Sequence, residues 1–321
     1  MSKSSAVAEP FITGLHFGEC PRWHDGRLWY SDFFDHGVFS VSSDGERRTE
    51  VDFDGEPAGL GWLPDGRLLI NSRLDRAIMR READGTLVRH GELTPWATGH
   101  ANDMVVAGNG QAYAGNFGFE LDRVYDGTVD RSNIGPTSLV RVDPDGSSHE
   151  AAADLAFPNG TVISADGGTL IIAESMGGCL TAFDRHADGT LARRREWAAL
   201  PEAFAPDGIC LCEDGTIWVA NALGAEFVRV AEGGAIVERV TTSQGSFACM
   251  LGDDDRKTLY LVIAETSDPV RARWIVWLTI DMVPPPTSFL VLTRPRSGST
   301  PVVSQSMSKP MVLWLTNPLA M

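Results

Sequence analysis

Short apolar runs separated by glycine turns dominate the chain, and long helical periodicity is almost absent. The clearest turns contain Asp-Gly or a close relative. An apolar run lies on each side of such a turn, which is the pattern of a β-hairpin. The turn glycines of five of these hairpins are Gly26, Gly66, Gly110, Gly167 and Gly215. The pattern therefore predicts an all-β protein that is built from hairpins.

The hairpins repeat at a nearly regular interval. Successive turn glycines are separated by 40, 44, 57 and 48 residues, and a sixth turn near Asp255 follows the last of them. Further strand pairs lie between the hairpins and have turns of their own, such as Asp44-Gly45 and Asp145-Gly146. Roughly 40–50 residues per unit, with about four strands in each, is typical of β-propeller blades. The sequence thus predicts a six-bladed β-propeller.

Two segments depart from the repeat. The gap from Asn116 to Ile134 in the third blade predicts an inserted loop, which is either a lid over one face or a tolerated surface excursion. After residue 269 no Asp-Gly hairpin occurs, and residues 270–321 carry five basic residues and one acid. We therefore expect an N-terminal segment at 1–13, the propeller at 14–268 and an atypical tail at 269–321. The tail is either a divergent extension or the product of a reading-frame error, and disorder is one expectation for it.

Charge and cysteine content narrow the function classes. The net charge is −16, which repels phosphate backbones and argues against nucleic-acid binding. The five cysteines have no paired spacing, which favours a reducing compartment. The N-terminus lacks the apolar core of a signal peptide, and no apolar run is long enough to span a membrane. We expect a cytoplasmic protein that is a monomer or a small homo-oligomer, without a membrane partner.

The repeat also allows equivalent positions to be compared between blades. Seven or eight residues before each turn glycine, and at the matching place in the sixth unit, the residues are Glu19, Ala58, Asn102, Asn159, Asp207 and about Ala248. The innermost strands of a propeller line its central channel, so these positions should form a ring. Taken singly, Asn159-Gly160 and Asp207-Gly208 are typical of turns.

Taken together, the four polar members of this ring predict a metal site. Burying the carboxylates of Glu19 and Asp207 side by side would be costly without a cation. The donors are hard oxygens, so one divalent cation is expected, Ca²⁺ first, with Mn²⁺, Mg²⁺ or Zn²⁺ as alternatives. They are too few to fill a Ca²⁺ shell, which leaves positions for water and substrate.

A second set of polar residues follows about six residues after the turns. Its members are Asp32, Ser72, Asn116, Glu174 and Asn221. The second hairpin strand returns to the same face as the ring, so Asn116 and Glu174 are expected to lie at the rim of the site and contact substrate. His100 precedes Asn102 by two residues and is expected either to share its face or to be a polar loop residue.

Four motifs resemble one known family. GECPRW, HANDMVV with GNFGF, FPNGTVIS, and APDGICL with IWVAN are similar, in order and spacing, to the gluconolactonase family, also called senescence-marker-protein or regucalcin-like. The resemblance extends from Gly14 to Asp268 and implies a six-bladed β-propeller with one divalent metal in its channel. It implies Glu19, Asn159 and Asp207 as metal ligands and Asn102 as a substrate contact. Many members place Arg where this chain has His100.

The expected activity is metal-dependent hydrolysis of a sugar lactone, such as an aldonolactone, to the aldonic acid. Asp207 is expected to accept the proton of the attacking water as well as bind the metal. Asn102 and His100 would hold sugar hydroxyls, and Asp103 would orient Asn102. The alternatives are a metal-dependent sugar-acid dehydratase, a phosphotriester hydrolase on the same site, and a calcium-binding propeller without catalysis.

Overall fold

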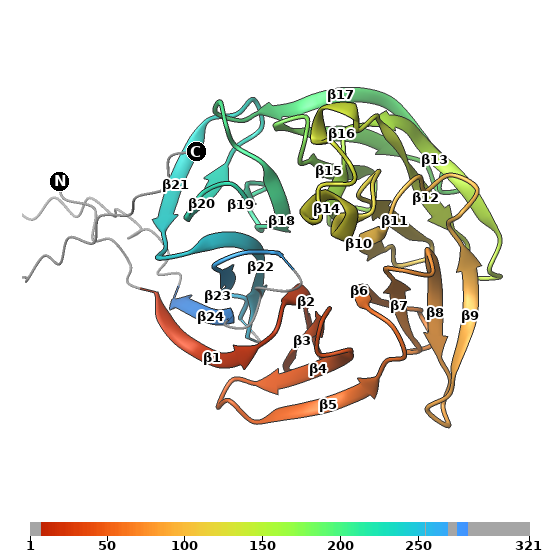
Figure 1. The fold of residues 1–321 in the computed structure, drawn as a ribbon, viewed down its shortest axis with the longest axis horizontal. Helices are drawn as coiled ribbons and strands as arrows, with labels where there is room; N and C mark the ends of the chain where they lie inside the picture. The colour runs from red at the N-terminus through yellow and green to blue at the C-terminus, as the bar shows by residue number, and fades with distance from the viewer. Residues whose placement is uncertain (1–7, 254, 269–274, 282–321) are drawn as a thin grey trace, which may run out of the picture. The chain divides into compact units, whose positions relative to one another are not determined.

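The hairpins of the sequence assemble into six antiparallel sheets of four strands each, arranged in a ring (Figure 1). The computed structural model describes residues 8–253, 255–268 and 275–281. In the first five blades the chain runs from the innermost strand to the outermost through consecutive hairpins. The prediction of a six-bladed β-propeller is therefore confirmed.

The first three blades use the strands in chain order. Blade one contains β2 (Gly18–His24), β3 (Arg27–Asp32), β4 (Gly37–Ser42) and β5 (Arg47–Asp52). Blade two contains β6 (Pro57–Trp62), β7 (Leu68–Ser72), β8 (Ala77–Arg81) and β9 (Leu87–Glu92). Blade three contains β10 (Ala101–Val106), β11 (Ala112–Asn116), β12 (Thr137–Val142) and β13 (Ser148–Leu155).

The next two blades repeat this order. Blade four contains β14 (Pro158–Ile163), β15 (Thr169–Glu174), β16 (Cys179–Arg185) and β17 (Leu191–Ala199). Blade five contains β18 (Pro206–Leu211), β19 (Ile217–Asn221), β20 (Glu226–Val230) and β21 (Ile236–Thr241). Within the third blade, the insertion holds the short helix α1 (Leu121–Tyr125) and the 3₁₀ turn η1 (Arg131–Asn133). The described residues contain no helix with the length and apolar character that a membrane span requires.

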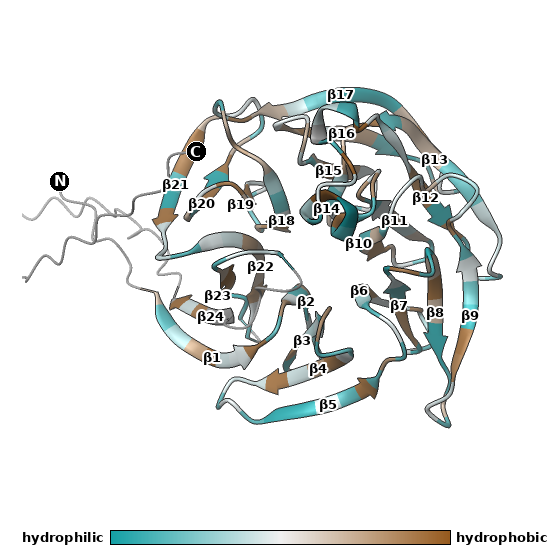
Figure 2. Cartoon of the chain, viewed as in Figure 1, coloured by the Kyte–Doolittle hydropathy of each residue, from teal (hydrophilic) through white to brown (hydrophobic). Residues whose placement is uncertain are grey.

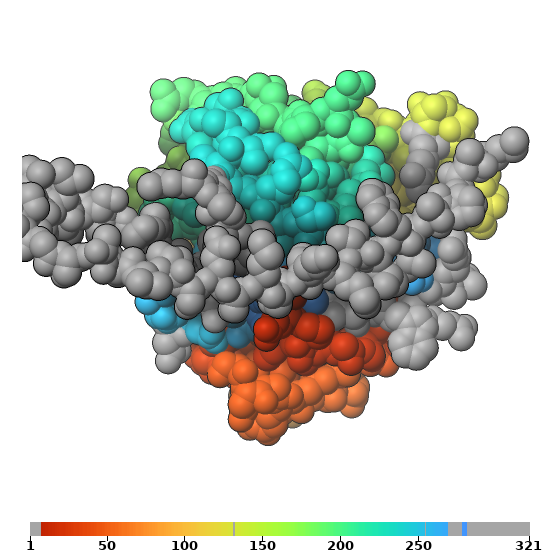
Figure 3. Space-filling view, turned by 90° about the vertical axis from the view of Figure 1, so that its left-hand side faces the viewer, coloured from red at the N-terminus to blue at the C-terminus, as the bar shows by residue number. Residues whose placement is uncertain are grey.

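The sixth blade joins two distant parts of the chain. Its sheet order is β22 (Gly245–Gly252), β23 (Thr258–Ala264), β24 (Ile275–Asp281) and β1 (Glu9–Leu15). Figure 3 shows β1, in red, between the fifth blade in cyan and the first blade in orange. Both β24 and most of β1 lie outside the interval 14–268 that the repeats predict for the propeller. The other residues of the predicted tail, 269–274 and 282–321, lie outside the described residues.

The core lies between the blades. Strands near the channel, such as β7 and β19, are buried along their whole length, whereas β5 and β17 at the outer edge are largely exposed. Figure 2 shows hydrophilic residues along these outer strands. Continuous apolar runs are expected where both faces of a strand are covered. This packing fixes the inner strands, on which the polar ring is built.

Candidate metal centre

Four polar side chains occupy equivalent positions in four innermost strands. Glu19 lies in β2, Asn102 in β10, Asn159 in β14 and Asp207 in β18. The pairing of each of these strands with the next strand of its blade is irregular at or beside this position. A β-bulge redirects the side chains next to it. The irregular pairing therefore turns the ring side chains out of the normal alternation at one end of the channel.

Asn159-Gly160 and Asp207-Gly208 belong to strands and are not turns. Neither glycine has a positive φ. A Cβ on Gly160 would lie 2.5 Å from the carbonyl oxygen of Asp207, and one on Gly208 would lie 2.7 Å from the Cα of Ala248. The glycines are therefore needed because neighbouring inner strands approach each other closely. The interpretation of these dipeptides as loop corners is wrong.

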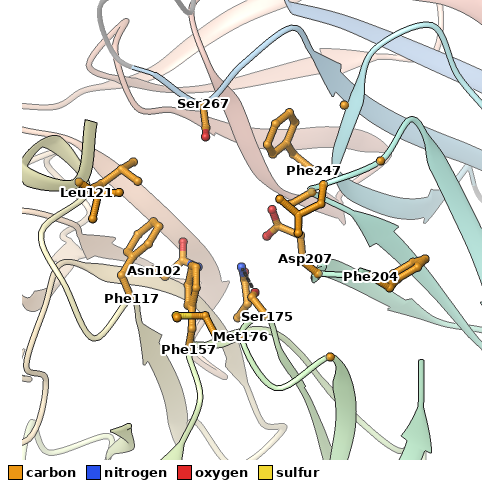
Figure 4. A pocket seen from close by; sticks show the side chains of 18 of the residues that line it. Asn102, Phe117, Leu121, Phe157, Ser175, Met176, Phe204, Asp207, Phe247 and Ser267 are labelled. Atoms are coloured by element: carbon orange, nitrogen blue, oxygen red, sulfur yellow. Dashed lines mark hydrogen bonds between the residues drawn. The ribbon is translucent and has the colours of Figure 1, made fainter. Parts of the chain in front are cut away.

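A cavity of about 960 Å³ lies at this end of the channel, and all four ring residues line it. Figure 4 shows the Asp207 carboxylate and the Asn102 amide pointing into the cavity. Glu19, Asn102 and Asn159 are buried, and Asp207 is half-buried. The two ring positions without a polar group hold Ala58 and Ala248, which leave space beside the oxygens.

The two carboxylates are held where their charged forms are unfavourable. Burial and the charge of Asp207 raise the pKa of Glu19 well above its ordinary value. Burial raises the pKa of Asp207 to about 8, against a hydrogen bond from Asn159 that lowers it. The charge of Asp103 raises the pKa of both groups. A bound cation would favour the ionised forms, because it replaces the water that these groups have lost.

The donor set fits a hard divalent cation. Two carboxylates and two amides offer oxygen ligands, which Ca²⁺ and Mg²⁺ prefer. Within the described part of the chain, no group of three or more His, Cys, Asp and Glu side chains is placed to hold a metal ion. Binding here would therefore also need the amide oxygens. The Asn159 amide nitrogen donates to Ser175 Oγ at 3.0 Å, and a half-turn of this amide exchanges its oxygen and nitrogen.

Asp103 lies beside the cavity and not in its lining. Its Oδ1 accepts from Arg22 Nη2 at 2.6 Å and from the backbone N–H of Met104 at 2.8 Å. Arg22 is in the first blade and Asp103 in the third, so this ion pair links two blades that are not neighbours. The predicted role of orienting Asn102 is therefore not what its contacts indicate. Asp103 holds Arg22 and adds negative charge near the two ring carboxylates.

His100 also lies outside the cavity lining. Its Nδ1 accepts from the backbone N–H of Leu121 at 3.2 Å and contacts Arg73 Nη1 at 3.1 Å. Burial and the charge of Arg73 lower the pKa of His100 to about 4, so the ring is neutral near pH 7 and Nδ1 can accept. His100 thus anchors the insertion of the third blade, and its contacts do not support the predicted role in binding sugar hydroxyls.

Asn116 and Glu174, which were expected to touch substrate, are buried and hydrogen-bonded within the protein. The Asn116 amide accepts from the N–H of Gly118 at 3.0 Å and donates to Ser138 O at 2.8 Å. Glu174 accepts from the N–H of Ala156 at 2.8 Å. Neither residue lines the cavity. Their side chains accept from backbone N–H groups of adjacent loops and do not line the cavity. They therefore hold these loops in place.

The insertion of the third blade covers part of the cavity. Its residues in the lining are Phe117, Phe119, Leu121, Val124, Tyr125 and Ile134. The hydroxyl of Tyr125 hydrogen-bonds with that of Ser267, which follows β23 of the sixth blade. Of the two alternatives for this segment, the lid is therefore correct. The aromatic lining was missed from the sequence, because a phenylalanine carries no signal for whether it faces a cavity or a core.

Three comparisons relate the chain to known proteins. The family model described as the SMP-30/Gluconolactonase/LRE-like region matches residues 17–265. No curated protein matches the chain. Among solved structures, a gluconolactonase from Xanthomonas campestris is 24% identical, with a TM-score of 0.68 over 86% of this chain and 90% of that one.

Two further structures have the same fold. A calcium-binding protein, regucalcin, from Agrobacterium tumefaciens is 18% identical, with a TM-score of 0.69 over 86% of this chain and 94% of its own. A luciferin-regenerating enzyme is 16% identical, with a TM-score of 0.70 over 86% of this chain and 96% of its own. At these sequence identities, the similarity to the solved structures shows a shared fold and nothing beyond it.

Proposed function

Because this chain belongs to the SMP-30/Gluconolactonase/LRE-like family, we propose that it is a lactonase that uses a divalent cation. The sugar lactones that the family implies, such as aldonolactones, are the reference substrates. The reaction is the addition of water to the lactone carbonyl, followed by cleavage of the ring C–O bond to give a hydroxy acid.

One observation carries the proposal. Two acids and two amides converge on one end of a cavity from equivalent positions of four blades. A purely structural role would pair these acids with basic side chains or with several backbone N–H groups. Instead, both are placed where burial raises their pKa, and such placement is characteristic of functional sites.

The residues of the centre would have distinct roles. Glu19, Asn159 and Asp207 would hold the cation through their oxygens, with Ca²⁺ expected first. A bound divalent cation would polarise the lactone carbonyl or lower the pKa of a water molecule. Asp207 would accept the proton of the attacking water and return it to the ring oxygen as the C–O bond breaks. The Asn102 amide would hold the substrate beside these groups.

The proposal is tested with a panel of lactones after chelation. The protein is treated with excess chelator, dialysed, and assayed for acid release with Ca²⁺, Mn²⁺, Mg²⁺ or Zn²⁺ added back. We expect negligible turnover in the chelated protein and recovery with at least one cation. Hydrolysis that is unaffected by chelation would contradict the proposed role of the cation, and hydrolysis of no lactone with any cation would contradict the proposed activity.

A further inference from the structure

The wall of the cavity is strongly aromatic on two sides. On the lid side, Phe117 packs against Phe157 with ring centroids 4.7 Å apart, and Phe119 lies 5.6 Å from Phe157. On the other side, Phe17 packs against Phe247 at 5.2 Å and against Phe33 at 5.5 Å. All six rings belong to residues that line the cavity. The polar ring therefore lies at the base of a chamber whose sides offer apolar surface.

The charged residues of the lining are all acidic. Glu19 and Asp207 lie at the polar ring, and the exposed Glu202 and Glu265 lie elsewhere in the lining. Among the described residues, no Lys, Arg or His lines the cavity. A bound divalent cation would offset the charges of Glu19 and Asp207, so the remaining field comes from Glu202 and Glu265. It disfavours phosphorylated or carboxylated substrates, because like charges repel. It argues against a sugar acid as the substrate.

One polar residue close to the ring in sequence bonds to the lid and does not line the cavity. His100 is two positions from Asn102 in sequence, but its Nδ1 is used by the backbone of Leu121 and by Arg73. A sugar lactone presents several hydroxyls, and each one that is buried without a partner costs binding energy. Of the hydroxyls in the lining, those of Tyr125 and Ser267 bond to each other, and that of Ser175 donates to the carbonyl oxygen of Pro206.

The backbone at the wall is held in an unfavourable conformation. Phe157 has a φ of 60° and Ala203 has a φ of 62°, and both residues line the cavity. A positive φ is sterically unfavourable for non-glycine residues, so the surrounding structure must hold it.

The mouth of the cavity exposes apolar side chains. Met176 and Leu223 line the cavity and are 48% and 69% exposed. Each follows the last residue of a second hairpin strand by two positions, Glu174 in β15 and Asn221 in β19. Leu74 holds the equivalent position after Ser72 of β7 and is 46% exposed, but it lies outside the cavity lining. Exposed apolar groups around an opening are typical of a binding site for apolar ligands.

We propose that the substrate is an uncharged lactone with an apolar substituent, alkyl or aromatic, that lies between the two groups of phenylalanines. This inference rests on the proposed lactonase activity and narrows its substrate class. The lactone carbonyl faces the polar ring, and the substituent fills the chamber towards Met176 and Leu223. Hydrolysis converts the neutral ester into a carboxylate, one proton and a hydroxyl group, and the acidic lining favours release of this anion.

The first experiment compares chain lengths. γ-Butyrolactone, γ-hexalactone, γ-octalactone and γ-decalactone are assayed beside glucono-δ-lactone with the cation that restores activity. We expect kcat/KM to rise about threefold to fourfold for each added methylene until the chamber is filled. Equal rates along the series, or faster hydrolysis of glucono-δ-lactone than of every alkyl lactone, would overturn this inference and leave the lactonase proposal intact.

A binding measurement separates the two proposals. Alkyl lactams of the same chain lengths resist hydrolysis, and their affinity is measured by calorimetry. Affinity that rises with chain length, together with hydrolysis of no lactone, would support the apolar chamber and overturn the lactonase activity. Affinity that does not depend on chain length would overturn the chamber as the recognition site.

Variants locate the binding surface. Phe119→Ala should lower the ratio of kcat/KM for γ-decalactone over γ-butyrolactone about tenfold, since an aromatic wall of the chamber is lost. Phe11→Ala is the matched control, because Phe11 is also half-buried and packs against Tyr260 but does not itself line the cavity. Its ratio should equal that of the unmodified protein.

Leu223→Ser alters an exposed side chain without disturbing the core and should lower the same ratio about threefold. An unchanged ratio in both Phe119→Ala and Leu223→Ser would contradict the proposal.

Discussion

Two sets of polar residues lie at the open ends of the same hairpins, one on the first strand and one on the second, and they have opposite surroundings. The ring set, Glu19, Asn102, Asn159 and Asp207, lines the cavity. The second set, which includes Asp32, Asn116, Glu174 and Asn221, is buried among backbone N–H groups. Residue type and repeat position are similar in both. The two sets differ in what surrounds their side chains. The ring set faces a cavity, whereas the second set is hydrogen-bonded to the backbone of loops.

Asp32 shows the second kind of surroundings most clearly. Its Oδ1 accepts from the N–H of Phe17 at 2.8 Å and from that of Asp35 at 3.0 Å, and its Oδ2 accepts from that of His16 at 2.9 Å. Three backbone N–H groups therefore donate to this one carboxylate. The segment that Asp32 holds leads directly to Glu19. Glu174 and Asn221 hold the N–H groups of Ala156 and Ala205 in the same way, so these members of the second set fix the segments that precede ring residues.

The largest expected effect comes from breaking the ring set. Asp207→Asn should lower cation-dependent kcat/KM about 10³-fold, because the proposed proton acceptor and one charged oxygen ligand are lost together. The chelated variant should be at least as stable as the chelated unmodified protein at pH 8, since a buried carboxyl that is costly to ionise has been removed. Steady-state assays and thermal unfolding measure the two effects. A stable variant with full activity would contradict the assignment.

The same substitution in the second set should act in the opposite way. Asp32→Asn should destabilise the protein by about 2–3 kcal/mol, because one of the two oxygens that accept from buried N–H groups is replaced by an NH2 donor. Denaturant unfolding with and without chelator measures this loss. Any loss of activity should follow the fraction of unfolded protein. If the variant instead kept its stability but lost cation affinity, the distinction between the two sets would fail.

A pH dependence of stability is also expected in the chelated protein. The pKa of Asp207 is raised from 3.8 to about 8 on folding, so the folded protein holds more protons than the unfolded chain between these values. The free energy of unfolding should therefore fall as pH rises through this window and level off above it. Thermal unfolding across the window measures the slope. Asp207→Asn should flatten it, whereas a slope unchanged by that substitution would assign it to other groups.

The ring could be predicted from the sequence, because the hairpin turns define equivalent positions in each blade without reference to the ring residues themselves. Asn159 and Asp207 both lie eight residues before a turn glycine, and the structure places both in the cavity lining. Blade number followed from the same period. These features depend on contacts between residues that are close in the sequence, so they can be recognised from one sequence.

The surroundings of individual polar groups could not be predicted in this way. His100 binds the backbone of Leu121, and Glu174 binds that of Ala156. Both partners are backbone groups, which have no sequence signature. The wall formed by Phe117 and Phe157 has the same limitation, because an aromatic residue packs equally well against a core or a cavity. The strand β24 lacks the Asp-Gly turn that identified the other hairpins.

The pairing of β1 with β24 has a consequence for biosynthesis. Of the described strands, β1 is made first, and its partner within the sixth blade is β24, which is made last. The blades between them can form as the chain leaves the ribosome, since each contains only consecutive strands. Closure of the ring must wait until residue 281 has emerged. During translation, β1 therefore has an open edge that can pair with the wrong strand, and a ribosome that stalls before residue 275 would release a ring that cannot close.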